Sequence, residues 1–217
     1  MKDIAIYGAG GFGREVACLI QQINKASDNN KSKWNIVGFF DDNIEKGNRN
    51  EYGEVLGGLT ELNSWQNSLS VVIAIASPKS VKRIVENVTN KNVDWPNIIA
   101  PDVTILDRNN LKMGKGNIVC SRCFFSCHVI IGDFNIFNGY VLVGHDNVIG
   151  NYNTIMPAVR LSGKLSIGNC NFFGVNSIVL QNLQIGNNTT IGAGSIVFRK
   201  TEDGYTYVGN PAKKYEF

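Results

Sequence analysis

The sequence lacks the features that mark nucleic-acid-binding and membrane proteins. Of its 217 residues 18% are charged, the net charge is +3, and Lys and Arg form no tract. A nucleic-acid partner requires concentrated positive charge, so we set that class aside. The longest strongly apolar run is Val71–Ala76, far below the roughly 20 residues of a membrane-spanning helix. We therefore expect no membrane span.

Neither a disulfide framework nor a signal peptide is expected. The chain has five cysteines, an odd number, and disulfide-rich domains normally carry even sets. Met1-Lys2-Asp3-Ile4 leads directly into an apolar segment, which leaves no room for the charged and apolar regions of a signal peptide. Both observations predict a reducing, cytoplasmic compartment.

An internal repeat runs through the second half of the chain. From Met113 to Val197 every sixth residue is large and apolar, although only 43% of all residues are hydrophobic. Dipeptides of an apolar residue and glycine recur every 18 residues: Met113-Gly114, Ile131-Gly132, Ile149-Gly150, Ile167-Gly168 and Ile185-Gly186. Three hexapeptides per coil predict a prism of short parallel strands, with one side chain per strand pointing inward and glycine at turns.

Small, apolar or asparagine residues precede each inward residue by two positions. They fill the prism, and the asparagines among them are expected to stack in ladders at the turns: Asn117, Asn135, Asn147, Asn153 and Asn171.

The first hundred residues predict a small α/β domain. Ile4–Tyr7, Ile36–Phe40 and Val71–Ala76 read as buried strands. Apolar residues at helical spacing follow the first and third of these strands, so the strands form a parallel sheet.

A glycine-rich loop, Gly8-x-Gly10-x-x-Gly13, joins the first strand to its helix, and Asp41-Asp42 end the second strand. This pattern matches the dinucleotide fingerprint, but about 100 residues hold only half of such a fold. We therefore expect residues 1–100 to bind a nucleotide or nucleotide-like acceptor, with phosphates at the helix N-terminus, rather than NAD. Residues 101–217 form the second domain. The alternative is that the glycines only make a tight turn.

These features together resemble a known family. The hexapeptides and the ending Gly209-Asn210-Pro211-Ala212-Lys213 are similar to the hexapeptide-repeat acyltransferases, which fold as left-handed parallel β-helices. The half-Rossmann domain ahead of them narrows the resemblance to acetyltransferases of bacterial surface-glycan synthesis. These include UDP-4-amino-sugar and perosamine N-acetyltransferases and sialic acid O-acetyltransferases. The resemblance implies acetyl-CoA as co-substrate, a sugar or nucleotide-sugar acceptor, and a homotrimer.

The resemblance also implies roles for particular residues. His145 is the general base, Asp146 orients it, and Asn138 assists; Gly163, one coil above His145, is expected to leave open space over the imidazole. The acceptor site is implied at Gly10, Gly11, Phe12, Asp41, Asp42 and Ala76, and the coenzyme contacts at Gly163, Val175 and Ala193. The family often has histidine where this chain has Phe12.

The remaining cluster, Cys120, Cys123, Cys127 and His128, resembles a metal site. On the hexapeptide frame these residues span two faces, so we expect no zinc. The β-helical carbonic anhydrases need three histidines per zinc, and this chain has two. Other open alternatives are O-acetylation, an NAD-linked oxidoreductase and a non-catalytic trimeric binding protein.

Overall fold

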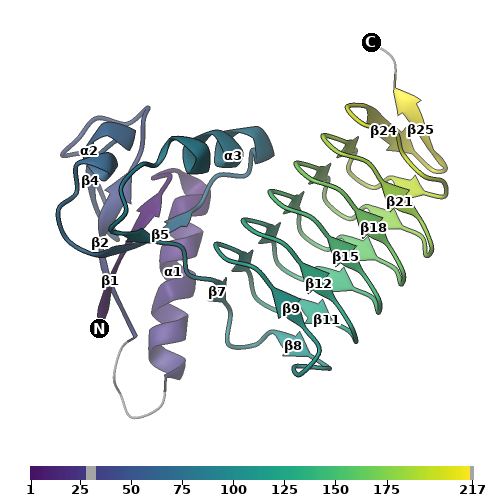
Figure 1. Cartoon of the computed structure of the whole chain (residues 1–217), viewed down its shortest axis with the longest axis horizontal. Coiled ribbons are helices and arrows are strands. Elements are labelled where there is room, and N and C mark those ends of the chain that lie inside the picture. Colours follow the sequence, from purple (N-terminus) through teal and green to yellow (C-terminus); the bar gives the residue numbers. More distant parts are fainter. Residues whose placement is uncertain (28–32, 216–217) are drawn as a thin grey trace. The chain divides into compact units, whose positions relative to one another are not determined.

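The computed structural model describes residues 1–27 and 33–215 and divides into two compact units (Figure 1). Met1–Ala76 with Ser80–Pro101 form the first, and Ser77–Lys79 with the chain from Asp102 onward form the second. No helix within the described residues has the length and apolar character to cross a membrane.

The first unit is built on a six-stranded sheet with the order β3-β4-β2-β1-β5-β6, parallel except for the β3–β4 pair. The strands are β1 (Lys2–Tyr7), β2 (Trp34–Phe40), β3 (Arg49–Asn50), β4 (Gly53–Gly57), β5 (Leu69–Ile73) and β6 (Val93–Asp94), followed by β7 (Ile98–Ile99). The helices are α1 (Gly11–Ala26), α2 (Leu59–Asn63) and α3 (Pro78–Asn87).

The strands and helices expected from the apolar pattern are confirmed in β1, α1, β2, β5 and α3. Ile4 and Ile6 of β1 are fully buried, as the continuous apolar strands of a parallel sheet require, and Ile20 of α1 is fully buried as well. The order β2-β1-β5 means that the chain leaves β1 toward one neighbour and later returns beside the other. Open α/β sheets bind ligands at such a switch point, outside the carboxyl ends of the strands.

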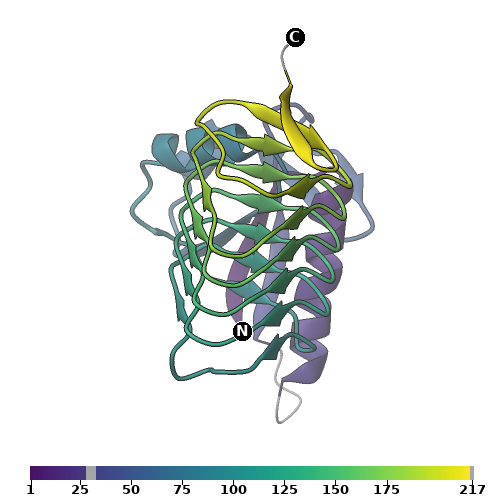
Figure 2. The same cartoon turned by 90° about the vertical axis from the view of Figure 1, so that its right-hand side faces the viewer.

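The second unit is a parallel β-helix of stacked coils (Figure 2). We name its faces by one strand each: the β10 face, the β11 face and the β12 face. The β10 face contains β10 (Ile118–Val119), β13 (Ile136–Phe137), β16 (Thr154–Ile155), β19 (Phe172–Phe173), β22 (Thr190–Ile191), β24 (Thr206–Gly209) and β25 (Ala212–Tyr215). The β11 face contains β8 (Thr104–Ile105), β11 (Phe124–Phe125), β14 (Leu142–Val143), β17 (Arg160–Leu161), β20 (Ile178–Val179) and β23 (Ile196–Val197). The β12 face contains β9 (Lys112–Met113), β12 (Ile130–Ile131), β15 (Val148–Ile149), β18 (Ser166–Ile167) and β21 (Gln184–Ile185).

The hexapeptide prediction is confirmed. Strands pair in register 18 residues apart, as Phe125 with Val143 and Val143 with Leu161. From Val119 to Val197 every sixth residue is at most 3% exposed. Met113 alone is half-buried, because it belongs to the first strand of the β12 face and has no coil beneath it.

The glycines at the turns are needed for a reason other than the one expected. Most residues in the left-handed conformation are not glycine, including His128 (φ 55°) and Asp146 (φ 58°), and the glycines that directly follow the inward residues do not adopt it. Gly150 instead makes room for the next coil, because a Cβ there would lie 2.7 Å from the carbonyl oxygen of Gly168.

The expected asparagine ladder is present on the edge between the β12 and β10 faces. Asn135 Nδ2 donates to Asn117 Oδ1 at 3.1 Å, and Asn153 Nδ2 donates to Asn135 Oδ1 at 3.0 Å. Asn171 continues it through its backbone N–H. Asn147 lies on a different edge and does not join this ladder.

Candidate active site

A pocket of about 350 Å³ lies in the first unit, at the carboxyl ends of β1, β2 and β5. Its lining includes five residues expected at the acceptor site: Gly10, Gly11, Phe12, Asp41 and Asp42. Ala76 is exposed and is not among the lining residues; Ala74 and Ile75 line the pocket instead. The chain thus reaches the pocket wall just before Ala76.

The four glycines of the loop have two different reasons to be glycine. A Cβ on Gly8 (φ +109°) would lie 2.7 Å from Ala74 O, and a Cβ on Gly13 would collide with Gly8 O. These two are required by packing. Added Cβ atoms on Gly10 and Gly11 meet nothing within 4 Å. Their backbone therefore faces the open pocket, and the absence of side chains there leaves room for a ligand to approach it.

The N-terminus of α1 suits an anion. Gly10 occupies the N-cap position without a side-chain cap, and the first turn has no acidic residue. Free N–H groups and the helix dipole favour negative charge there. Arg83 and Ser80 of α3 also line the pocket, so a guanidinium and a hydroxyl supplement the helix end. Sequence reasoning did not assign a role to Ser80.

The two aspartates at the end of β2 hold the pocket wall together. Ala9 N donates to Asp41 Oδ2 at 2.9 Å, which ties the glycine loop to β2. The Tyr7 hydroxyl donates to Asp42 Oδ2 at 2.8 Å, and Leu59 N donates to Asp42 Oδ1 at 2.9 Å. Burial and the bond to Asp42 raise the pKa of Tyr7 above its ordinary value. Tyr7 therefore stays a neutral donor.

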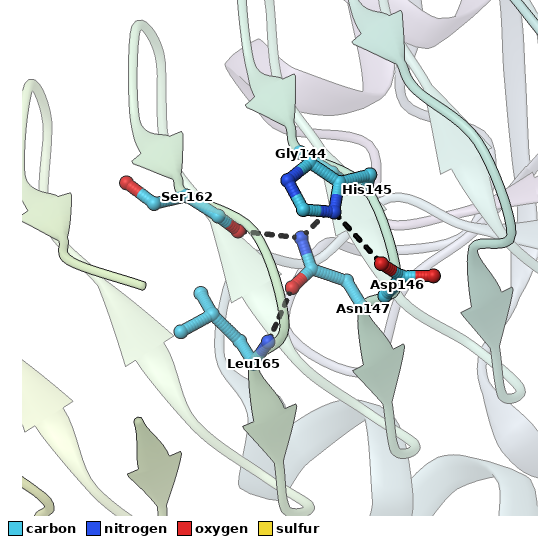
Figure 3. Close-up of polar contacts among 6 residues, drawn as sticks. All are labelled: Gly144, His145, Asp146, Asn147, Ser162 and Leu165. Atoms are coloured by element: carbon cyan, nitrogen blue, oxygen red, sulfur yellow. Dashed lines mark hydrogen bonds and ion pairs between the residues drawn. The ribbon is translucent and has the colours of Figure 1, made fainter. Parts of the chain in front are cut away.

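His145 and Asp146 form a hydrogen-bonded pair on the turn between β14 and β15 (Figure 3). The ring Nδ1 lies 2.8 Å from Asp146 Oδ2. Neighbouring side chains on a strand point apart, and the left-handed conformation of Asp146 at this turn lets them meet. A carboxylate only accepts, so Nδ1 carries a proton, and in the neutral ring Nε2 then keeps its lone pair. Nε2 is thus available as a base.

The carboxyl group of Asp146 remains ionised. The hydrogen bond with His145 lowers the pKa of Asp146, and electrostatic interactions with His145, His128 and Lys164 act in the same direction. His128 lies one coil before Asp146, and its interaction with this carboxylate is one of the smaller effects that lower the Asp146 pKa.

The imidazole itself fills the space that we expected to be open over Gly163. A Cβ on Gly163 would lie 2.5 Å from His145 Nε2 and 2.7 Å from Cε1. The expectation of a gap is therefore wrong. The missing side chain makes room for the base rather than for a ligand above it.

Asn138, Val175 and Ala193 lie on a different edge of the prism from His145 and Gly163. They follow strands of the β10 face, whereas the turns of His145 and Gly163 follow strands of the β11 face. One chain therefore does not bring Asn138 beside His145, because the β11 face separates the two edges.

Among residues 1–27 and 33–215, no group of three or more His, Cys, Asp or Glu side chains is placed to hold a metal ion, and this includes the cysteine-rich run. Cys120 and Cys123 flank the edge between the β10 and β11 faces, and Cys127 lies on the next edge. The Cys123 thiol bonds to Asn138 O at 3.1 Å, and burial raises its pKa to about 12. This thiol is a packing group.

A parallel β-helix with an exposed His–Asp pair, preceded by a half-Rossmann unit, defines the hexapeptide-repeat acyltransferase class. Residues 3–88 match the model of the PglD N-terminal domain. The chain is 30% identical over 182 residues to the GDP-perosamine N-acetyltransferase of Escherichia coli O157:H7, covering 83% of this chain and 79% of that protein.

Solved structures agree over the whole chain. The acetyltransferase domain of PglB from Neisseria gonorrhoeae FA1090, in complex with acetyl coenzyme A, is 28% identical with a TM-score of 0.87, covering 99% of each chain. WeeI from Acinetobacter baumannii AYE is 28% identical with a TM-score of 0.86, covering 99% of this chain and 100% of that one.

The chain therefore belongs to the N-acetyltransferase family that includes GDP-perosamine N-acetyltransferase. The expected half-Rossmann unit and left-handed parallel β-helix are confirmed with it.

Proposed function

We propose that this enzyme transfers the acetyl group of acetyl-CoA to the amino group of a nucleotide-linked 4-amino sugar. The observation that carries the proposal is the His145–Asp146 pair at 2.8 Å, with the Nε2 edge of the ring against Gly163. It stands in a chain whose relative acts on GDP-perosamine and whose structural neighbour binds acetyl coenzyme A.

The reaction follows from these groups. The acceptor amine attacks the thioester carbonyl carbon, and His145 Nε2 takes the proton that the nitrogen loses. Backbone N–H groups stabilise the oxyanion of the tetrahedral intermediate. The intermediate expels the CoA thiolate, which receives the proton from the imidazolium. Asp146 stabilises the imidazolium while it exists and holds the ring tautomer.

The first unit binds the acceptor through its nucleotide. The diphosphate lies against the backbone of Gly10 and Gly11, at the uncapped N-terminus of α1, with Arg83 as its counter-charge. Asp41 and Asp42 keep spare lone pairs for sugar or base donors. Phe12 lines the same pocket and adds an apolar wall to the acceptor site.

The coenzyme binds between neighbouring copies in a homotrimer. Gly163 and the pair Val175 and Ala193 lie on different edges of one prism, so a single ligand reaches both sets only when edges of two prisms meet. Ile130 is 42% exposed and Val148 48% exposed on the β12 face, which leaves apolar surface for such an interface. Light scattering on the eluting protein should give three times the chain mass; a monomer would contradict the trimer.

The five cysteines are all free, which supports the proposed cytoplasmic compartment. The test of the function is a panel of UDP-, dTDP- and GDP-linked amino sugars and sialic acids, assayed for CoA release and product mass. N-acetylated nucleotide sugar supports the proposal, and O-acetylated sialic acid would replace it. Titration with NADH and with acetyl-CoA tests the oxidoreductase alternative, which requires that the protein bind NADH.

A further inference from the structure

A buried amide interrupts an apolar row on the edge that carries His145. Residues 18 apart stack along this edge; the position of Asn147 is occupied by Leu111, Val129, Leu165 and Leu183 in the other coils, and by Thr201 at the last place of the row. Asn147 is fully buried. Burying an amide among apolar side chains costs free energy unless its hydrogen bonds are satisfied. The coils on either side have valine or leucine at this position. The buried amide of Asn147 must therefore serve a purpose specific to its own coil.

The amide of Asn147 joins the turn of His145 to the turn of Gly163 (Figure 3). Its Nδ2 donates to Gly144 O at 3.0 Å and to Ser162 O at 2.9 Å. Its Oδ1 accepts from Leu165 N at 2.7 Å. Gly144 and Ser162 immediately precede His145 and Gly163, so one side chain sets the spacing between the base and the backbone beneath it.

The His145 side chain is 57% exposed. Its Nδ1 bonds to Asp146, and its Nε2 edge occupies the place that a side chain on Gly163 would take.

Gly163 does not need to be glycine for its own conformation, since it is absent from the residues with positive φ. Other residues in its row carry side chains: Cys127, Gln181 and Arg199. The nearest atoms that a Cβ on Gly163 would meet all belong to the His145 ring.

We propose that Asn147 and Gly163 are positioning residues for His145: the Asn147 amide fixes the distance between two turns, and the bare Gly163 backbone seats the ring. The inference rests on the proposed function, in which Nε2 receives the acceptor's proton. Asn147, which is fully buried, does not touch the substrate in this role. Both act by fixing where the lone pair of Nε2 points.

Asn147→Leu, which restores the apolar row, tests the first part. The matched control is Asn153→Leu, because Asn153 is equally buried and also makes three side-chain hydrogen bonds, on another edge. We expect Asn147→Leu to lower kcat roughly 10- to 100-fold, the cost of misplacing a catalytic group by about 1 Å, with the KM for acetyl-CoA within about twofold. Asn153→Leu should lower Tm at least as much and leave kcat within about twofold. Equal kcat losses in the two variants, or none in Asn147→Leu, would overturn the role of Asn147.

Gly163→Ala tests the second part through a double-mutant cycle with His145→Ala. We expect the alanine to lower kcat on the order of 10²-fold in the wild-type background and to have no further effect once the imidazole is gone. Equal losses in both backgrounds would show that Gly163 acts on the coenzyme instead of on His145.

A readout without substrate separates this proposal from the proposed function. The chain has only two histidines, so long-range ¹⁵N spectra resolve both rings, and His145→Ala assigns them. At pH 8 we expect the protein to show His145 protonated at Nδ1 alone, and Gly163→Ala and Asn147→Leu to show mixed tautomers, with Asn153→Leu unchanged. An unaltered His145 signature in the first two variants would refute the proposal. If the signature changes but no acceptor is acetylated, the function fails and the positioning stands.

Discussion

The substitution Gly11→Asp separates the two explanations of the glycine loop, because it should change stability and binding in opposite directions. Gly11 is the first residue of α1, and its Cβ would meet nothing within 4 Å. A carboxylate at this position interacts favourably with the helix dipole and stabilises the fold by about 0.3–1 kcal/mol. Thermal unfolding should therefore occur at an equal or higher temperature.

The same carboxylate would point into the pocket toward the proposed diphosphate. Two unit charges about 6 Å apart repel by about 0.7–2.8 kcal/mol for effective dielectric constants of roughly 80 to 20, which corresponds to a rise in acceptor KM of about 3- to 100-fold. The KM for acetyl-CoA should not change. Gly11→Asn, similar in size but neutral, is the control and should have a smaller effect. An unchanged acceptor KM in Gly11→Asp, with wild-type stability, would mean that the glycines only form a tight turn and would refute the acceptor assignment.

Further outcomes follow from the same geometry. Phe137→Ala should cost about 3–5 kcal/mol of unfolding free energy, measured by urea denaturation, because Phe137 is fully buried against Phe125 at 5.1 Å between ring centroids; a loss under 1 kcal/mol would contradict the packed interior. Gly13→Ala should yield misfolded protein by circular dichroism, since its Cβ would collide with Gly8 O, and a stable variant would contradict the loop geometry. Folding lowers the pKa of Asp146 from its ordinary value of 3.8, so the stabilising effect of its ionised form is present above that value and lost as pH falls through the lower folded value. Between pH 5 and 8 Asp146 stays ionised, so a decline of kcat/KM with acid in that window reports protonation of a group other than Asp146; a flat profile would contradict an imidazole base.

Much of the fold could be predicted because its repeating unit is short. One inward residue every six positions sets the strands, and the 18-residue spacing sets the coils, so Phe125 and Val143 were placed correctly without coordinates. The first unit was harder. Strand β4 is five residues long and begins and ends in glycine, and helix α2 depends on a bond from Gly58 N to the Glu61 carboxylate. Neither carries enough apolar periodicity to be found from sequence.

The structure brings His145 and Asp146 together, but how the ring lies at Gly163 could not be predicted from the sequence. The sequence indicates His145 and Asp146, and the glycine loop beside Asp41, but the repeat frame does not say what fills the space above Gly163. That depends on the rotamer of His145, which its bond to Asp146 fixes. Asn147 appeared to be one more stacking asparagine, because the six-residue frame alone does not distinguish the edges of the prism.

The most direct test of the account is the mass of the product formed from acetyl-CoA and a nucleotide-linked 4-amino sugar such as GDP-perosamine, compared between the wild-type enzyme and His145→Ala. We expect equimolar CoA and N-acetylated nucleotide sugar from the wild type. We expect kcat roughly 10²–10⁴-fold lower in the folded variant, the usual contribution of a positioned general base, and a smaller loss in Asp146→Asn. A folded His145→Ala enzyme with undiminished kcat would contradict the proposed mechanism.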